Sequence, residues 1–247
     1  MASYHTLNEL HHIFNFDIKD NLFIYRRKHS IDEFNMLIDA VARDPNINGI
    51  DIGSISISNT ELDILTNMLK QNKNITSLSV HNINGGNGFM LSHEFLSFFD
   101  MLSHNNNITK FEYYNGTFHN RTKYFGELLE KNTSLTSLNL QNNNITNDDM
   151  KILSNGLSKN RTLTSIDISK NKFDDIGLEY LLGALKHNYS LIFIEFSNTV
   201  DVIDDHYFMN EIDYYYNTKL IVDAIYKELE NNKNYKDKLM YKIFKNI

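Results

Sequence analysis

An eleven-residue pattern occurs twice in the middle of the chain, and it restricts the possible folds more than any other feature. Residues 135–145 read LTSLNLQNNNI, and residues 163–173, 28 positions later, read LTSIDISKNKF. Apolar residues at positions 1, 4 and 6 of the pattern place one side of a short strand in a core. The asparagines at position 9, Asn143 and Asn171, can turn their amides inward and satisfy backbone groups where the chain leaves the strand. The pattern predicts stacked strand–turn–helix units.

The pattern resembles the leucine-rich repeat template L-x-x-L-x-L-x-x-N-x-L, in the 28-residue, ribonuclease-inhibitor-like class. The resemblance implies an α/β, right-handed solenoid shaped as a horseshoe segment. Parallel strands would line its concave face, helices its convex face, and a helical cap its C-terminal end. The family mostly binds other proteins, so the resemblance also implies partner binding without naming the partner.

Degenerate copies extend the repeat in both directions. Leu22 and Ile24 fit positions 4 and 6 of a first unit, and Leu135 and Leu163 open the two best units. We expect strands near 22–24, 50–52, 78–80, 111–113, 138–140, 166–168 and 194–196. A glycine-rich insertion, Gly85–Gly88 with its flanking asparagines, lengthens one unit to 33 residues. Because only two units have the position-9 asparagine, we expect the outer units to be less regular.

Both ends depart from the repeat. Residues 12–18 alternate like a short strand or cap, and residues 206–216, 220–229 and 235–244 have apolar residues at helical spacing. We expect one structural domain, with an N-terminal cap and repeats over 1–199 and a helical cap over 200–247. Lysines around the last apolar stripe leave open a basic amphipathic helix that lies on a membrane or in a partner's groove.

Asparagines recur where each predicted helix ends, in phrases such as QNKN at 71–74 and KHNY at 186–189. Asparagine tolerates the left-handed conformation that often closes a helix. We therefore expect these residues to act as C-caps at the repeat period.

Composition excludes several classes of function. The formal net charge of -7 argues against nucleic acid as the main ligand, since phosphate binding requires a basic face. The absence of cysteine removes disulfides, cysteine nucleophiles and cysteine metal sites, and fits a reducing compartment. No signal peptide or bilayer-spanning apolar run is evident, so we expect a cytoplasmic monomer that does not insert stably into a membrane.

No motif for catalysis or for a cofactor is present. The chain lacks H-E-x-x-H, G-x-S-x-G and the Walker loop, and the glycine-rich insertion lacks the lysine of a phosphate-binding loop. Neighbouring histidines and acids, such as His93 with Glu94, fit surface or capping roles better than metal ligation. We therefore expect no enzyme activity, no cofactor and no metal.

The concave face is the expected binding surface, and positions 2, 3, 5, 7 and 8 of each unit should point into it. Position 5 reads Phe23, Asp51, Ser79, Glu112, Asn139, Asp167 and Glu195 down the stack, with four carboxylates and no basic residue. Aromatic or imidazole side chains flank this acidic stripe at position 7. The candidate partner-binding residues are Tyr25, Asp51, His81, Glu112, Tyr114, Asn139, Asp167 and Glu195.

These features predict a non-enzymatic module that binds a basic polypeptide segment through its concave face. The cysteine-free, Asn/Ile/Lys-rich style also resembles the leucine-rich-repeat effectors of intracellular bacterial pathogens. That resemblance implies translocation into a host cell and a host protein as the partner. The alternative is a repeat carrier whose C-terminal helices form a membrane-targeting or small catalytic module.

Overall fold

The computed structural model describes residues 6–14, 16–25, 30–53, 57–81, 93–116, 121–197 and 220–234. Strands and helices alternate along these residues. The helices are α1 (Leu7–Phe14), α2 (Ile31–Arg43), α3 (Asn59–Gln71), α4 (His93–His104), α5 (Thr122–Lys131), α6 (Asn147–Lys159) and α7 (Asp175–Leu185). The strands are β1 (Asp17–Lys19), β2 (Leu22–Tyr25), β3 (Gly49–Gly53), β4 (Ser77–His81), β5 (Lys110–Tyr114), β6 (Ser137–Asn139), β7 (Ser165–Asp167) and β8 (Phe193–Glu195).

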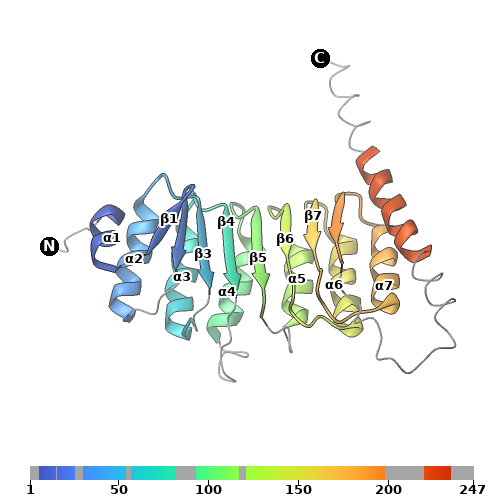
Figure 1. The fold of residues 1–247 in the computed structure, drawn as a ribbon, viewed down its shortest axis with the longest axis horizontal. Helices are drawn as coiled ribbons and strands as arrows, with labels where there is room; N and C mark the ends of the chain where they lie inside the picture. Colours follow the sequence, from blue (N-terminus) through green and yellow to red (C-terminus); the bar gives the residue numbers. More distant parts are fainter. Residues whose placement is uncertain are drawn as a thin grey trace, which may run out of the picture.

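All eight strands form one sheet in chain order, from β1 to β8. The pairs from β2 to β8 are parallel, and only β1 is antiparallel to its neighbour β2. Helices α2 to α7 lie in a row behind one face of the sheet, while the strands line the opposite side (Figure 1). This is the architecture of an α/β leucine-rich repeat solenoid, as predicted.

The core lies between the sheet and the helices. The residues at positions 1, 4 and 6 are buried in the central units, for example Leu135, Leu138 and Leu140 in one unit and Leu163, Ile166 and Ile168 in the next. The helices contribute the opposite wall, because their apolar residues recur at spacings of three and four. Each unit thus buries its apolar side against its neighbours, and the stack has one continuous core.

The two position-9 asparagines lie inside the core and join neighbouring turns. Asn143 is fully buried; its amide nitrogen donates to the Tyr113 carbonyl (2.5 Å) and its amide oxygen accepts from the Gly116 N–H (3.0 Å). Asn171 accepts from the N–H groups of Asn143 (2.9 Å) and Ile145 (3.1 Å). Each asparagine therefore bonds the backbone of the preceding unit, which fixes how consecutive turns stack.

A second set of asparagines connects the ends of the helices, by a mechanism other than the predicted one. The backbone of Asn72, Asn132 and Asn160 is extended, with φ between -72 and -66° and ψ between 134 and 142°, so the expected left-handed cap is wrong for these three. The side chain closes the turn instead. Asn160, for instance, donates to the Leu129 carbonyl of the preceding unit (2.7 Å) and accepts from the Leu163 N–H (2.7 Å). The same two-sided bonding recurs at Asn72, Asn105, Asn132 and Asn188.

The N-terminal unit differs from its prediction in two respects. Residues 7–14 form α1, and only residues 17–19 are a strand, so of the two alternatives for residues 12–18 the strand is wrong over 12–14. In β2 the buried residues are Phe23 and Tyr25, which pair with Ile50 and Ile52, whereas Leu22 and Ile24 were expected to be inward. All four residues of β2 are apolar or aromatic, so alternation cannot choose the inward face. The two rings bury more area, and they contact Phe16 and Phe34 at centroid distances of 5.1 Å.

A helix over residues 220–234 packs on the last repeat. Ile225 and Leu229 are buried in the core, and Asn232 donates to the Leu191 carbonyl at 2.7 Å. These contacts are those of a helical cap. The helix expected over 206–216 and the apolar stripe over 235–244 lie outside the described residues, as does the Gly85–Gly88 insertion. None of the described helices has the length and hydrophobicity required to cross a bilayer.

Candidate protein-binding face

Six polar side chains form one row across the strand face. The sheet register aligns the position-5 residues of β3 to β8, which are Asp51, Ser79, Glu112, Asn139, Asp167 and Glu195. We call this set the position-5 row. Adjacent strands lie about 5 Å apart, so neighbouring side chains of the row share one electrostatic field.

At the β3–β5 end of the row, His81 links three strands. Its Nε2 lies 2.9 Å from Oδ1 of Asp51, and its ring stacks on Tyr114 at 4.5 Å with an interplanar angle of 6°. A Cβ atom added to Gly53 would lie only 2.3 Å from this ring, so the imidazole lies directly over the glycine of the neighbouring strand. Asp51 and His81 are both buried. This part of the face is closed by its own side chains, and the Asp51 carboxylate already has a partner.

Glu112 also has a cationic partner, which the predicted face lacked. The ammonium of Lys110, two residues earlier on β5, lies 2.7 Å from its carboxylate. Position 5 itself has no basic residue, as expected, but Lys110 lies on the same face in the adjacent column. Lys110 lies at position 3 of its unit and was not among the predicted site residues.

Over β6 to β8 the position-5 side chains bond the backbone at position 7. Asn139 accepts from the Gln141 N–H and Asp167 from the Ser169 N–H, both at 2.9 Å. Glu195 accepts from the Ser197 N–H at 2.9 Å, and hydrogen bonds from the Ser197 side chain and backbone lower the pKa of this carboxyl below its usual range. Glu195 is therefore ionised at neutral pH.

Asp167 and Glu195 lie next to each other in the register of β7 and β8. Within the described ranges neither carboxylate has a lysine, arginine or histidine within ion-pair distance. Both side chains are half-buried at the strand face. This pair is the part of the row where negative charge is not compensated.

The structure brings all but one of the predicted binding residues to this face. Tyr25 is the exception, because it is 1% exposed and lies in the core as a consequence of the shifted β2 register. By the same shift, Ile24 and not Phe23 lies beside Asp51 at position 5. Phe193, which was not predicted as a binding residue, lies on β8 two residues before Glu195 and is 53% exposed.

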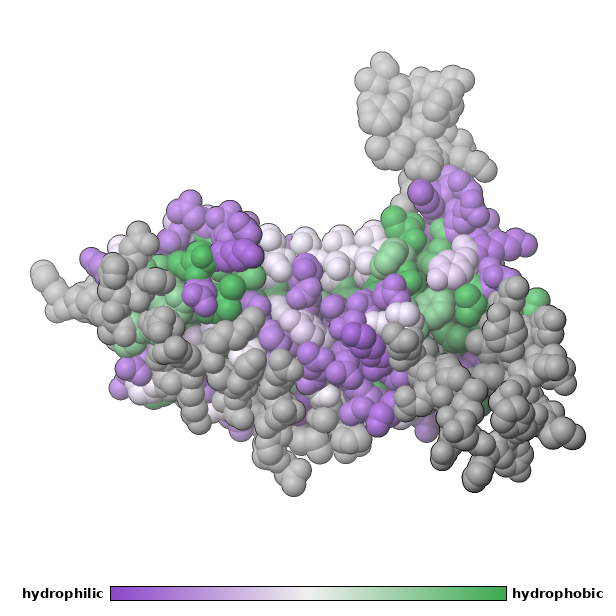
Figure 2. Space-filling model, viewed as in Figure 1, coloured by the Kyte–Doolittle hydropathy of each residue, from purple (hydrophilic) through white to green (hydrophobic). Residues whose placement is uncertain are grey.

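The surface view agrees with this division. Hydrophilic residues cover the middle of the visible strand side, and hydrophobic patches lie at its two ends, one near β1 and β2 and one near β8 and the 220–234 helix (Figure 2). No group of three or more acidic, histidine or cysteine side chains suited to a metal ion occurs in the part of the chain that the structure describes.

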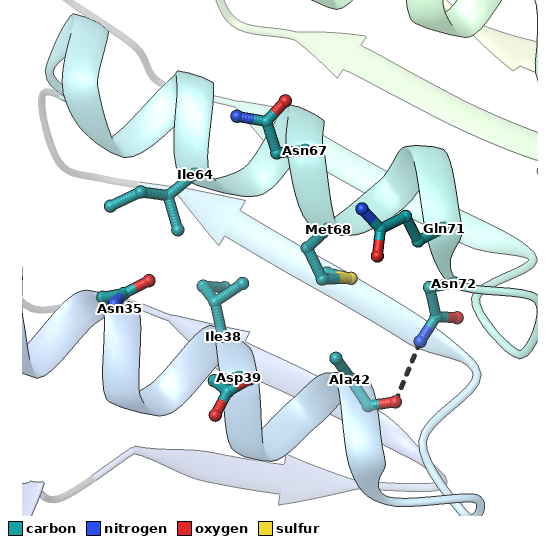
Figure 3. Close-up of a pocket in the computed structure, with 9 residues that line it drawn as sticks. All are labelled: Asn35, Ile38, Asp39, Ala42, Ile64, Asn67, Met68, Gln71 and Asn72. Carbon is teal, nitrogen blue, oxygen red and sulfur yellow. Dashed lines mark hydrogen bonds between the residues drawn. The ribbon is translucent and has the colours of Figure 1, made fainter. Parts of the chain in front are cut away.

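A groove on the opposite, helical side lies between α2 and α3. It encloses about 490 Å³, and Ile38, Ile64 and Met68 point into it (Figure 3). Met68 lies four residues before Asn72, the asparagine that caps α3. The corresponding residue in α6 is Gly156, and its missing side chain lets α5 and α6 approach closely. The one charged residue in the lining, Asp39, pairs with Arg43. This groove therefore presents amide side chains, such as those of Asn35, Asn67 and Gln71, but no uncompensated charge.

Comparison with known families agrees with the fold. Residues 131–154 and 159–182 match the family model described as Leucine Rich repeat. The chain is a leucine-rich repeat protein. The matched ranges contain most of the two units in which the position-9 asparagine is present.

Several solved structures resemble this leucine-rich repeat chain at low identity. The LegL7 protein of Legionella pneumophila is 15% identical, with a TM-score of 0.48 over 81% of this chain and 59% of that one. The tropomodulin C-terminal domain of Caenorhabditis elegans is 12% identical, with a TM-score of 0.45 over 87% and 99%. Leiomodin-1 Actin-Binding Site 2 is 15% identical, with a TM-score of 0.46 over 87% and 98%. Comparison with curated protein sequences gives no match.

Proposed function

We propose that this leucine-rich repeat protein is a non-enzymatic binding module that holds a basic polypeptide segment on its concave face. The observation that carries the proposal is the uncompensated pair Asp167 and Glu195 within the position-5 row. A lysine or arginine side chain of a partner would offset the repulsion between these two carboxylates and gain a charge-assisted contact.

Aromatic side chains beside the row, on β5 and on β8, supply apolar anchors. Phe193 is more than half exposed beside Glu195, and Tyr114 is half-buried against His81. Aromatic side chains often contribute most of the binding energy at protein interfaces, while surrounding charges set orientation and association rate. A partner segment with cations between apolar residues would fit this arrangement.

The geometry argues against acyl transfer. Asp51 and His81 resemble the carboxylate and base of a catalytic triad, and Ser79 lies in the same row. The buried Ser79 hydroxyl, however, makes no hydrogen bond with any described residue. The contact between nucleophile and base on which such catalysis depends is missing. His81 instead holds three strands together, which is a structural role.

The proposal includes a cytoplasmic, monomeric protein, or an effector that a bacterium delivers into a host cell to bind a host protein. The cysteine-free, Asn/Ile/Lys-rich composition supports this part. The alternative, a C-terminal targeting or catalytic module, has less support because the 220–234 helix is bonded to the last repeat through Asn232.

A peptide selection tests the proposed function. A random nonapeptide library would be selected against the wild-type chain and against the double variant Asp167→Asn/Glu195→Gln, which removes both charges of the uncompensated pair. Asp167→Asn keeps a side-chain oxygen that can accept from the Ser169 N–H, as Asn139 accepts from the Gln141 N–H. The backbone at the end of β7 should therefore keep its conformation. We expect lysine and arginine to be enriched by the wild type and not by the variant.

The matched control is Asp100→Asn/Glu127→Gln. It makes the same change in net charge on exposed helix residues. This control should select the same peptides as the wild type. If the wild type does not enrich lysine and arginine, or if the two double variants enrich them equally, the proposed function is wrong.

A further inference from the structure

The two edges of the sheet are protected very differently. At the N-terminal edge, β1 is antiparallel, and charged Asp17, Lys19 and Asp20 lie in it or directly after it. At the other edge, residues 191–197 read LIFIEFS, without lysine, arginine or proline. Soluble proteins usually blunt an exposed edge with such residues, because a bare edge accepts further strands. The edge at β8 lacks that protection.

The backbone groups at this edge repeat a pattern that every earlier unit uses. The Thr136 carbonyl accepts from the next unit's Thr164 (2.9 Å) and Ser165 (3.0 Å) N–H groups. The Leu140 N–H donates to the carbonyl of Asp167, and the Ile168 N–H to that of Glu195, both at 2.7 Å.

In the last unit the equivalent groups are the Ile192 carbonyl and the Phe196 N–H. The described residues include no ninth strand that bonds them, because β8 is last in the sheet. The edge of β8 therefore presents one acceptor and one donor. Their spacing is that of the groups that bond the next strand in each earlier parallel pair.

The side chains at the edge define what an added strand would meet. Phe193 and Glu195 project to the concave face, and Phe193 is 53% exposed. Ile194 projects to the core, and Phe196 follows two residues later and contacts Tyr226 of the 220–234 helix at a centroid distance of 5.9 Å. The hydrophobic surface near β8 and this helix is visible in Figure 2.

We propose that the open edge of β8 binds an extended segment of a partner polypeptide as a ninth strand. The segment would alternate so that an aromatic residue lies beside Phe193, aliphatic residues lie beside Ile194 and Phe196, and a lysine or arginine lies beside Glu195. Opposite charges and aromatic pairs on neighbouring strands are the contacts that stabilise a sheet face. Main-chain hydrogen bonds supply the affinity and the side chains the specificity.

A second copy of the chain fits this edge less well. Each chain has a formal net charge of -7, so two copies repel one another. The β1 edge of a second copy is charged and already paired in the antiparallel sense, so it cannot extend the parallel ladder. Charge complementarity therefore favours a basic partner strand. The inference does not depend on the proposed concave-face site, since it rests on backbone groups at the end of the sheet.

The test uses a ten-residue peptide whose central residues are Tyr-Ile-Lys-Val, titrated into the full chain and followed by NMR. Three comparison peptides accompany it. One has glutamate in place of lysine, one has glutamine there, and one is N-methylated at the tyrosine and at the residue before it. N-methylation removes the two donors that would reach the Ile192 carbonyl and leaves every side chain in place.

We expect the lysine peptide to bind saturably. Its binding should slow hydrogen exchange of the Phe196 amide by at least about tenfold. Hydrogen exchange of the Ile168 amide should not change, because that amide already donates to Glu195. The N-methylated and glutamate peptides should bind much more weakly. Glu195→Gln should lower the affinity for the lysine peptide by about two- to fivefold and leave the affinity for the glutamine peptide unchanged. The control Glu127→Gln, on the exposed side of α5, should change neither affinity.

Three results would overturn the proposal. The first is no saturable binding of the lysine peptide up to about 1 mM, which is the weak limit of useful affinity. The second is equal binding of the N-methylated peptide, or an unprotected Phe196 amide, which would place the peptide elsewhere, including on the concave face. The third is a dimer in sedimentation without peptide that protects the Phe196 amide, which would make a second copy the occupant.

Discussion

Replacing Asn143 by alanine tests whether the buried asparagines hold consecutive repeats together. The amide of Asn143 has two backbone partners in the preceding unit, the Tyr113 carbonyl and the Gly116 N–H. Alanine removes both bonds and offers no substitute, and the site is 0% exposed, so water cannot replace the amide without a rearrangement.

The magnitude follows from the burial of these partners. Each buried backbone group left without a partner costs about 1–3 kcal/mol. Gly116 is half-buried and can recover part of this through water, so we expect the free energy of unfolding to fall by about 2–3 kcal/mol. Asn171→Ala should cost more, because that amide bonds two N–H groups and also the carbonyls of Leu140, Ile168 and Ser169.

Urea denaturation followed by circular dichroism measures both changes. Asn155→Ala is the matched control, because Asn155 is exposed on α6 and its replacement should stay within about 0.5 kcal/mol of the wild type. An Asn143→Ala midpoint equal to that of the control would refute the argument that these amides bear on stability. A larger loss of unfolding free energy for Asn143→Ala than for Asn171→Ala would contradict the expectation that the side chain with more hydrogen bonds contributes more to stability.

Three further changes probe other parts of the molecule. Gly156→Ala should lower the melting temperature, because its Cβ would lie 2.5 Å from a carbonyl oxygen of α5, whereas Gly183→Ala, with open space around it, should stabilise by up to about 1 kcal/mol. Deleting residues 200–247 uncovers the end of the core and should give an aggregating chain by light scattering; a monomer with an unchanged melting temperature would contradict the capping role. Ser197→Ala should raise the pKa of Glu195 in an NMR titration, since hydrogen bonds from that serine are the main cause of its lowering. Because the folded pKa of Glu195 is depressed, its contribution to stability is present above the unfolded pKa and is lost as pH falls through the folded pKa.

The regular part of the fold was predictable because spacing determines it. Apolar residues at positions 1, 4 and 6 can be buried together only on one side of a strand, so the register of β3 to β8 followed directly. In β2 the predicted register was wrong. Its residues, Leu22–Tyr25, include no polar face, and the packing of the two rings determines which side is buried.

The candidate site was predictable as a row but not in its energetics. Alternation along strands of known register places Asp51, Glu112, Asp167 and Glu195 on one face. Which of these charges remain uncompensated depends on contacts between columns and on side-chain conformations. The Asp51–His81 contact joins neighbouring strands, and no one-dimensional pattern indicates it. Alternation does place Lys110 and Glu112 on one face, but whether the two side chains pair depends on their conformations.

The capping asparagines show a similar limit. Their recurrence predicted that they close helices, but the backbone of Asn160 is extended and its side chain reaches Leu129, 31 residues earlier. A propensity describes the residue and its immediate neighbours, whereas this bond exists only because the preceding repeat is stacked against it.

The most direct test of the central claim, that the concave face binds a basic polypeptide, is an affinity measurement at two ionic strengths. The strongest-binding peptide from the selection would be titrated calorimetrically into the wild type, Asp167→Asn/Glu195→Gln and the helix-side control, at about 0.05 M and about 0.5 M salt. We predict that the double variant loses affinity on the order of tenfold at low salt, about 0.7 kcal/mol for each charge removed, and that high salt largely abolishes this difference. Equal affinity of the wild type and the double variant at low salt would contradict the claim.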